Sequence, residues 1–220
     1  MKVLVIGTEP SLEEFKAKFT AEHEYDFRTD YDFGPEDLEN TDVVFDYLID
    51  ENPEALELYL PYAQLTAFLS VPKTSLAELT HVFGRGECTF VGFNGLASFT
   101  HRRKLEVSLL FEDTEPRLAE ICKALGTEYL LVQDRVGMVI PRLMVAIVNE
   151  AYYTLQDGTA TREDIDTAMR LRNRNTNGPF EWCKRVGIDN IYEILEALYE
   201  DTKDERYKIS PLLKREYLLR

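Results

Sequence analysis

The chain has 220 residues and a formal net charge of −15 at pH 7, and its 45% hydrophobic and 30% charged content is typical of a folded globular protein. Residues 1–80 hold 5 Lys and Arg against 18 Asp and Glu, whereas residues 81–220 hold 20 against 22. We expect no nucleic-acid binding from so acidic a chain, no membrane span without a long apolar run, and a cytoplasmic location for three cysteines that lack paired spacing.

The first predicted strand, Val3 to Ile6, is apolar and ends at Gly7, as in a nucleotide-binding α/β domain. A dinucleotide requires the pattern G-x-G-x-x-G here, because the backbone must approach the pyrophosphate closely. Only Gly7 of that pattern is present. Ser11 and Glu14 have the spacing of a capping box, which would satisfy the amides that a phosphate otherwise takes. The sequence therefore predicts a closed nucleotide socket, with Gly7 as its one remaining cofactor-binding position.

The rest of the N-terminal half alternates between apolar strand patterns and helical patterns. Strands are predicted at 25–28, 42–49, 65–71, 88–93, 104–111 and 128–132. Helices are predicted at 12–19, 53–63, 75–83 and 115–125, with a polar connection over 30–42. Such alternation predicts a parallel sheet and a shortened α/β domain over residues 1–132.

The pattern becomes helical from residue 133 onward. Helices are predicted at 142–158, 161–171 and 189–201, and Thr161 and Asp164 occupy capping-box positions before the second. Apolar residues surround the axis of the first helix, which predicts that it is buried centrally or in a subunit interface. Residues 133–220 are therefore expected to form a separate all-α domain.

Motifs of the C-terminal half carry a family resemblance. "DRVGMVIPRLMVAIVNEAYYTLQDGTATREDIDTAMRL", "NGPFEWCKRVGID" and "RYKISPLLKREYL" resemble the C-terminal domain of 3-hydroxyacyl-CoA dehydrogenases. The strand at Val3, "TDVVFDYLIDENPE", "KTSLAEL" and "FVGFN" followed by "KLEV" resemble that family's NAD-binding domain more faintly. The resemblance implies a degenerate, shortened Rossmann-like domain of the NAD-binding type, an all-α domain after it, and a homodimer formed through the helical domain.

The resemblance also implies oxidation of a 3-hydroxyacyl-CoA, with hydride transfer to NAD. The family's pattern G-L-H-F-F-N-P lies on "GFNGLASFTHRRKLEV" without a gap, which places its catalytic glutamate on Glu106 and its histidine base on Asn94. The family's catalytic asparagine falls on Pro141. The hydroxyl of the family's N-T-S-S-L stretch would come from Thr74 or Ser75 of "PKTSL". An amide cannot accept the substrate proton, so the general base is missing from Asn94. His101, five residues from Glu106, is predicted to face the opposite side of a strand.

Basic residues form islands in this acidic chain. Arg102 and Arg103 precede "KLEV" and Lys104 begins it, and the resemblance places an acyl-CoA cleft beside this segment, so the three residues are candidates for substrate binding. A second basic run comprises Arg170, Arg172, Arg174, Lys184 and Arg185. The alternative for both islands is pairing with nearby carboxylates or contact with a second subunit.

Three hypotheses of function follow. The first is a catalytically degenerate family member that binds an acyl-CoA or a partner protein and holds no cofactor. The second is an active NAD-dependent dehydrogenase with an unorthodox base, and NAD is expected only in that case. The third is a structural dimerisation protein. No metal is expected under any of them, because the three histidines and three cysteines nowhere have ligand spacing.

Overall fold

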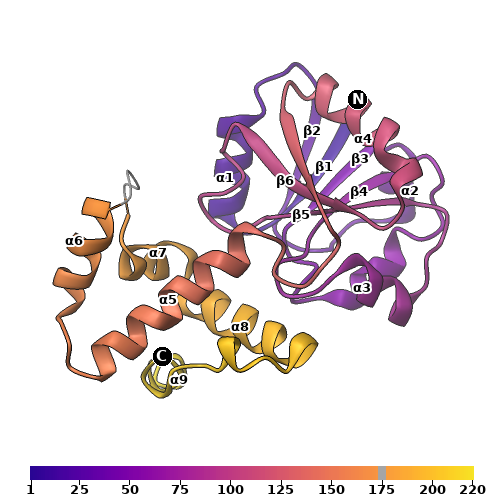
Figure 1. Ribbon diagram of the computed structural model, residues 1–220. Helices are drawn as coiled ribbons and strands as arrows, with labels where there is room; N and C mark the ends of the chain where they lie inside the picture. The colour runs from indigo at the N-terminus through magenta and orange to yellow at the C-terminus, as the bar shows by residue number, and fades with distance from the viewer. Residues whose placement is uncertain (173–176) are drawn as a thin grey trace. The chain divides into compact units, whose positions relative to one another are not determined.

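The computed structural model describes residues 1–172 and 177–220 (Figure 1). The chain forms two compact units, Met1–Met138 and Val139–Arg220. The predicted boundary at 132/133 falls a few residues earlier than this division. As predicted, the first unit is a Rossmann-like α/β fold and the second is helical.

The first unit is built on a seven-stranded sheet in the order β2-β1-β3-β4-β5-β6-β7. Its strands are β1 (Lys2–Ile6), β2 (Glu24–Arg28), β3 (Val43–Asp46), β4 (Thr66–Ser70), β5 (Thr89–Phe93), β6 (Lys104–Leu109) and β7 (Glu128–Val132). All neighbouring strands are parallel except β5 and β6, which are antiparallel. The prediction of a parallel sheet was wrong for this one pair of strands. No helix lies between β5 and β6 in the chain, so β6 pairs beside β5 in the opposite direction.

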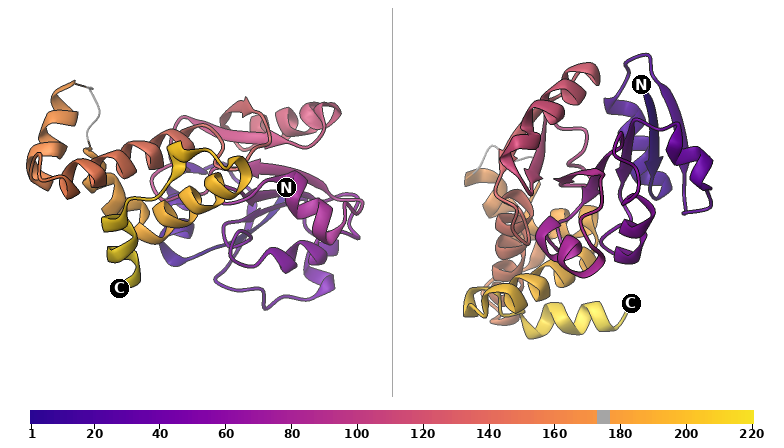
Figure 2. Two further views of the ribbon diagram at one scale, coloured as in Figure 1. Left: turned by 60° about the horizontal axis from the view of Figure 1, so that its bottom comes forward. Right: turned by 90° about the vertical axis from the view of Figure 1, so that its right-hand side faces the viewer.

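Helices cover both faces of this sheet (Figure 2). They are α1 (Glu9–Lys18), α2 (Pro35–Glu39), α3 (Leu76–Phe83) and α4 (Glu115–Ala124), with 3-10 turns at Pro53–Leu58 and Glu112–Thr114. One apolar cluster joins α1 and α4 to side chains such as Val3 and Val5, and the other joins α2 and α3 to Leu4 and Ile6. Alternate residues of one strand point to opposite faces, so β1 contributes to both clusters.

Two local predictions in this unit were wrong. The predicted helix over 53–63 is a 3-10 turn that ends at Leu58, and the predicted polar connection over 30–42 contains α2. In α2, Pro35 follows the N-cap Gly34, and the Asp37 carboxylate accepts a hydrogen bond from the Gly34 amide at 2.9 Å. These start signals lie within a polar stretch that has too few apolar residues for a helical stripe.

The second unit contains α5 (Ile140–Gln156), α6 (Arg162–Arg172), α7 (Pro179–Val186), α8 (Ile188–Thr202) and α9 (Pro211–Leu218), with a 3-10 turn at Glu205–Tyr207. Helix α5 packs against α7, α8 and α9. The predicted cap of α6 is confirmed, because the Asp164 amide donates to Thr161 Oγ1 at 3.2 Å. Val145 of α5 is fully buried, but Leu143 is 61% and Ile147 46% exposed. The alternative of central burial was therefore wrong, and the alternative of a subunit interface stays a prediction.

Candidate functional site

The candidate site lies at the edge of the sheet where β1, β3, β4 and β5 end. Because these strands are parallel, the residues that follow them meet at one edge, and β6 begins there because it runs the other way. The register pairs Phe93 with Val107, so Asn94 and Glu106 come directly opposite each other. The backbone N–H of Asn94 donates a hydrogen bond to the backbone carbonyl of Glu106 at 3.1 Å. The predicted pair is therefore brought together by strand register.

The side chains of Asn94 and Glu106 are also hydrogen-bonded. Asn94 Nδ2 donates to Glu106 Oε2 at 3.1 Å, and the Leu96 amide donates to Asn94 Oδ1 at 3.3 Å. The exposed fractions are only 3% for Asn94 and 5% for Glu106. Both ends of the amide are thus engaged, and neither can accept a proton from a substrate hydroxyl.

Tyr47 fills the space beside Gly7. A Cβ atom added to Gly7 would lie 3.2 Å from Tyr47 Cβ and 3.0 Å from Ser11 Oγ. The Tyr47 ring lies edge-on to Phe93, with centroids 5.0 Å apart, and its hydroxyl donates to Thr100 Oγ1 at 3.2 Å. The ring therefore spans from the end of β1 to the loop after β5. The close packing of Tyr47 and Ser11 against Gly7 leaves little room for a side chain at this position.

The start of α1 corrects the predicted capping box. The helix begins at Glu9 with Thr8 as its N-cap and Pro10 in its first turn, so Ser11 is already inside the helix. The Glu14 carboxylate does not turn back to Ser11. It accepts hydrogen bonds from the backbone amides of Ser98 at 2.9 Å and His101 at 3.0 Å, and His101 Nδ1 lies 2.8 Å from it.

Glu14 therefore ties the loop between β5 and β6 to α1. The same contacts correct the expectation for His101, which lies in a turn before β6 and not on a strand. His101 is engaged with Glu14, so it is the loop conformation, and not strand alternation, that sets its direction. Ser98 in this loop has a positive φ of 71°, a conformation rare for residues other than glycine.

A buried carboxylate that the sequence reasoning missed lies on the other face of the same edge. Asp46, at the end of β3, is fully buried and accepts hydrogen bonds from Tyr59 Oη at 2.8 Å, from Tyr31 Oη at 3.1 Å and from the Leu48 amide at 2.8 Å. Burial raises the pKa of Asp46 to about 6, although these hydrogen bonds oppose the rise. An acidic residue that ends an apolar strand, as in "VVFDY", is the signal that could have marked it.

The two candidate hydroxyls belong to the start of α3. Thr74 Oγ1 and Ser75 Oγ both donate to Glu78 Oε2, at 3.1 and 3.0 Å, and Ser75 Oγ accepts from the Glu78 amide at 3.1 Å. Asp134 accepts from the amides of Leu76 at 3.0 Å and Ala77 at 2.9 Å. These contacts cap the helix. The described hydrogen bonds of Thr74 and Ser75 are thus structural.

The basic candidates before β6 divide into two groups. Arg103 Nη2 lies 2.6 Å and Lys104 Nζ 3.4 Å from the Glu128 carboxylate, as the pairing alternative expects. The Arg102 guanidinium lies over the Phe99 ring at 4.2 Å, and partial burial lowers its pKa. In the second basic run Arg170 pairs with Glu181. Arg172 and Arg174 lie outside the residues whose side chains are described.

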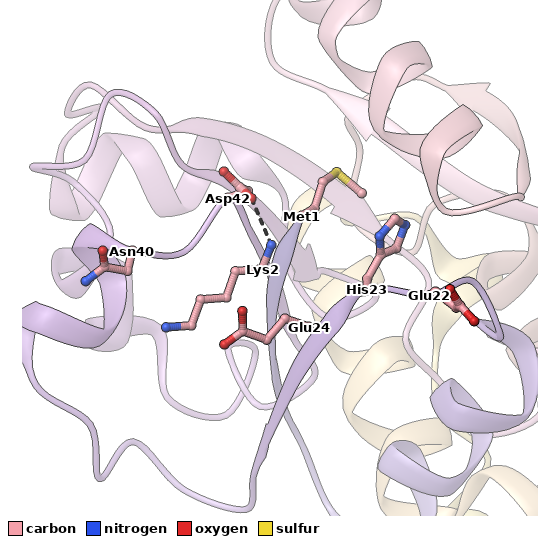
Figure 3. Close-up of a pocket in the computed structure, with 7 residues that line it drawn as sticks. All are labelled: Met1, Lys2, Glu22, His23, Glu24, Asn40 and Asp42. Carbon is pink, nitrogen blue, oxygen red and sulfur yellow. Dashed lines mark hydrogen bonds between the residues drawn. The ribbon is translucent and has the colours of Figure 1, made fainter.

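A wide hollow of about 880 Å³ lies at the opposite edge of the sheet (Figure 3). Its lining comprises Met1, Lys2, Glu22, His23, Glu24, Asn40 and Asp42, from the amino ends of β1 and β2 and the segment before β3. The Lys2 amide donates to Asp42 Oδ2 there at 2.8 Å. This hollow contains none of the candidate residues.

No three His, Cys, Asp or Glu side chains among the described residues are placed to hold a metal ion. No helix within residues 1–172 and 177–220 has the length and apolar character needed to cross a bilayer.

Comparison with known proteins supports the resemblance that the motifs predict. Residues 137–218 match the family model for the C-terminal domain of 3-hydroxyacyl-CoA dehydrogenase. The chain is 40% identical over 94 residues to 3-hydroxyadipyl-CoA dehydrogenase of Escherichia coli (strain K12), which covers 43% of this chain and 20% of that protein. It is 28% identical over 184 residues to the mitochondrial hydroxyacyl-coenzyme A dehydrogenase of Rattus norvegicus, which covers 79% of this chain and 58% of that protein.

A solved structure shows the same fold. The (S)-3-hydroxybutyryl-CoA dehydrogenase of Ralstonia eutropha superposes with a TM-score of 0.76 at 18% identity, over 97% of this chain and 92% of that one. The predicted resemblance to 3-hydroxyacyl-CoA dehydrogenases is confirmed. The chain nevertheless spans only part of the length of its curated relatives, from a fifth to under three fifths in the two matches above.

Proposed function

We propose that this chain is a catalytically degenerate relative of the 3-hydroxyacyl-CoA dehydrogenases, which binds an acyl-CoA or a partner protein without oxidising a hydroxyacyl group. The proposal depends chiefly on one observation: the side-chain amide of Asn94, the residue that the motif resemblance aligns with the family's histidine, is hydrogen-bonded to Glu106. General-base catalysis contributes about two to four orders of magnitude to such a reaction. His101, the histidine nearest to Glu106 in the sequence, is held by Glu14.

The cofactor side of the site supports the same proposal. A single glycine ends β1, Tyr47 packs against it, and the buried Asp46 lies on the other face of the edge. Close approach of a pyrophosphate to the backbone requires several glycines at this turn, and only Gly7 is present, with Tyr47 packed against it. We therefore propose that the chain keeps no resident NAD.

The proposal includes a homodimer formed through the helical unit. Leu143 and Ile147 lie four residues apart on α5, one turn from each other on the same face, and both are substantially exposed. A second copy of this face would remove both side chains from water. The exposed apolar stripe therefore supports self-association of this unit and is a candidate for the dimer interface that the resemblance implies.

Two measurements on the purified full chain separate the three hypotheses. NADH and acetoacetyl-CoA are titrated separately by calorimetry, and oxidation of 3-hydroxybutyryl-CoA is followed between about pH 6 and 10. We expect no NADH binding and no turnover above background. Binding of acetoacetyl-CoA alone would identify the acyl-CoA form of the proposal. Binding of neither ligand would favour a protein partner or a purely structural role.

The variant Asn94→His tests whether the base alone is missing. We expect a new histidine that titrates beside Glu106, and no gain in turnover, because a restored base cannot act without a bound hydride acceptor. The matched control is Asn40→His, at an exposed position remote from Glu106. Wild-type turnover that is abolished by Glu106→Gln would overturn the proposal and establish the active dehydrogenase.

A further inference from the structure

A pocket within the helical unit is not part of the site described above. It has a volume of about 370 Å³, within the range of small-molecule sites. Its lining comprises Tyr152, Arg162, Phe180, Cys183, Lys184, Gly187, Ile188 and Arg220. These residues come from α5, α6, α7, the start of α8 and the end of the chain after α9, so five parts of one unit converge on it.

The inner wall of this pocket is apolar and aromatic. The rings of Tyr152 and Phe180 meet edge to face with centroids 5.1 Å apart, and Cys183 is buried beside them. Burial raises the pKa of the Cys183 thiol, so this sulfur remains uncharged at neutral pH. The wall can therefore accept an aliphatic or aromatic group without leaving a buried charge unpaired.

The rim of the pocket is cationic. The Arg162 guanidinium lies 4.6 Å from the Phe180 ring and 5.2 Å from the Tyr152 ring, and it also pairs with Glu216. Arg220 pairs with Asp189. Lys184 is exposed on the rim and has no carboxylate partner among the described residues. Of these three cationic side chains, Arg162 and Arg220 pair with carboxylates, and Lys184 is the one left without such a partner among the described residues.

We propose that this pocket binds a small monocarboxylate with a short apolar chain. The apolar wall accepts the chain, and the rim, with Lys184 as the uncompensated cation and Arg162 beside it, binds the carboxylate. One excess charge suits a singly charged head group better than a polyphosphate. The inference uses only residues of the helical unit, so it does not depend on whether the first unit oxidises a substrate.

Hexanoate is the probe for this pocket, and 1-hexanol and inorganic phosphate are its matched comparisons. Amide resonances of the full chain are followed by NMR during each titration. We expect saturable hexanoate shifts centred on Gly187 and Ile188, with 1-hexanol and phosphate each binding at least about fivefold more weakly, because each offers only half of the interaction. Lys184→Gln should weaken hexanoate binding about fivefold.

The control variant is Lys208→Gln, an exposed lysine paired with Glu205 that does not line the pocket. It should leave hexanoate binding unchanged. Equal binding of 1-hexanol would overturn the role of the cations, and equal binding of phosphate would overturn the role of the apolar wall. Absence of shifts at Gly187 and Ile188, or an unchanged affinity in Lys184→Gln, would overturn the proposed site.

Discussion

The two units of this protein differ in what they have kept of the family that they resemble. The helical unit, Val139–Arg220, nearly coincides with the residues 137–218 that match the family model, and it has an open pocket with a cationic rim. The α/β unit has the sheet and an apolar layer on each of its faces, and Tyr47 packs closely against the single glycine that follows β1. Apolar alternation is enough to specify a fold, whereas chemistry requires particular residues at a few positions, so likeness of fold does not by itself establish a reaction.

The largest effect is expected from removal of the ring that covers Gly7. Tyr47→Ala deletes a buried aromatic side chain that packs against Phe93, and we expect a loss of about 3–5 kcal/mol in the free energy of unfolding. Tyr47→Phe keeps the ring and removes only the hydrogen bond to Thr100, so about 1 kcal/mol should be lost. Chemical denaturation measures both. Equal, small losses would show that the ring does not fill this edge.

The protonation of Asp46 is expected to have the next largest effect. Its pKa is raised by burial to about 6 from an ordinary value near 3.8, so the folded state binds the proton more tightly than the unfolded state. The cost of the buried charge is therefore fully present above pH 6, and this group's contribution to stability rises as the pH falls from about 6 toward 4. Asp46→Asn removes the titration.

We expect the free energy of unfolding of the wild type, relative to that of Asp46→Asn, to be larger at about pH 5 than at about pH 7.5, by roughly 1–1.5 kcal/mol. Denaturant titrations of both proteins at the two pH values measure this difference. The matched control is Asp113→Asn, an exposed carboxylate in the same unit, which should show little pH-dependent difference. A constant difference for Asp46→Asn would mean that this carboxyl group titrates normally.

How much of this edge the sequence can predict depends on the separation of the interacting residues. Asn94 and Glu106 are twelve residues apart, and the family resemblance assigned them to one site, which the register of β5 and β6 brings together. The partners of Glu14, Ser98 and His101, lie 84 and 87 residues away along the chain. The capping-box prediction paired Glu14 with Ser11 because local patterns consider only residues that are close in the sequence. Tyr47 was missed for the same reason, since nothing in "VVFDY" indicates that its ring reaches Gly7 and Thr100.

Secondary structure shows the same division between local and distant information. The strands follow from short apolar runs, and the cap at Thr161 follows from two residues three apart. The exposure of Leu143 and Ile147 could not be predicted from the apolar residues of α5, because composition does not show which face packs against α7, α8 and α9.

A smaller effect is expected at the Asn94 and Glu106 pair. Glu106→Ala leaves the buried Asn94 amide without its side-chain acceptor, and we expect a loss of about 1–3 kcal/mol in stability. Glu106→Gln keeps the shape and one acceptor oxygen, so its loss should be smaller. A double-mutant cycle with Asn94→Ala measures the coupling, expected to be about 1 kcal/mol. Zero coupling would show that the pair has no structural role at this edge.

The smallest effect on stability, and the clearest contrast between the two units, is expected on the surface of α5. Ile147→Asp and Leu143→Asp change side chains that are exposed in the single chain, so each should alter the free energy of unfolding of the monomer by only about 0.5 kcal/mol. If this face forms the homodimer, sedimentation should show a dimeric wild type and monomeric variants, because a buried, unpaired carboxylate opposes association.

The matched control is Val82→Asp, at an apolar residue of α3 that is 69% exposed in the other unit. It should remain dimeric. A monomeric wild type, or variants that stay dimeric, would remove α5 from the interface and leave its apolar stripe without a partner.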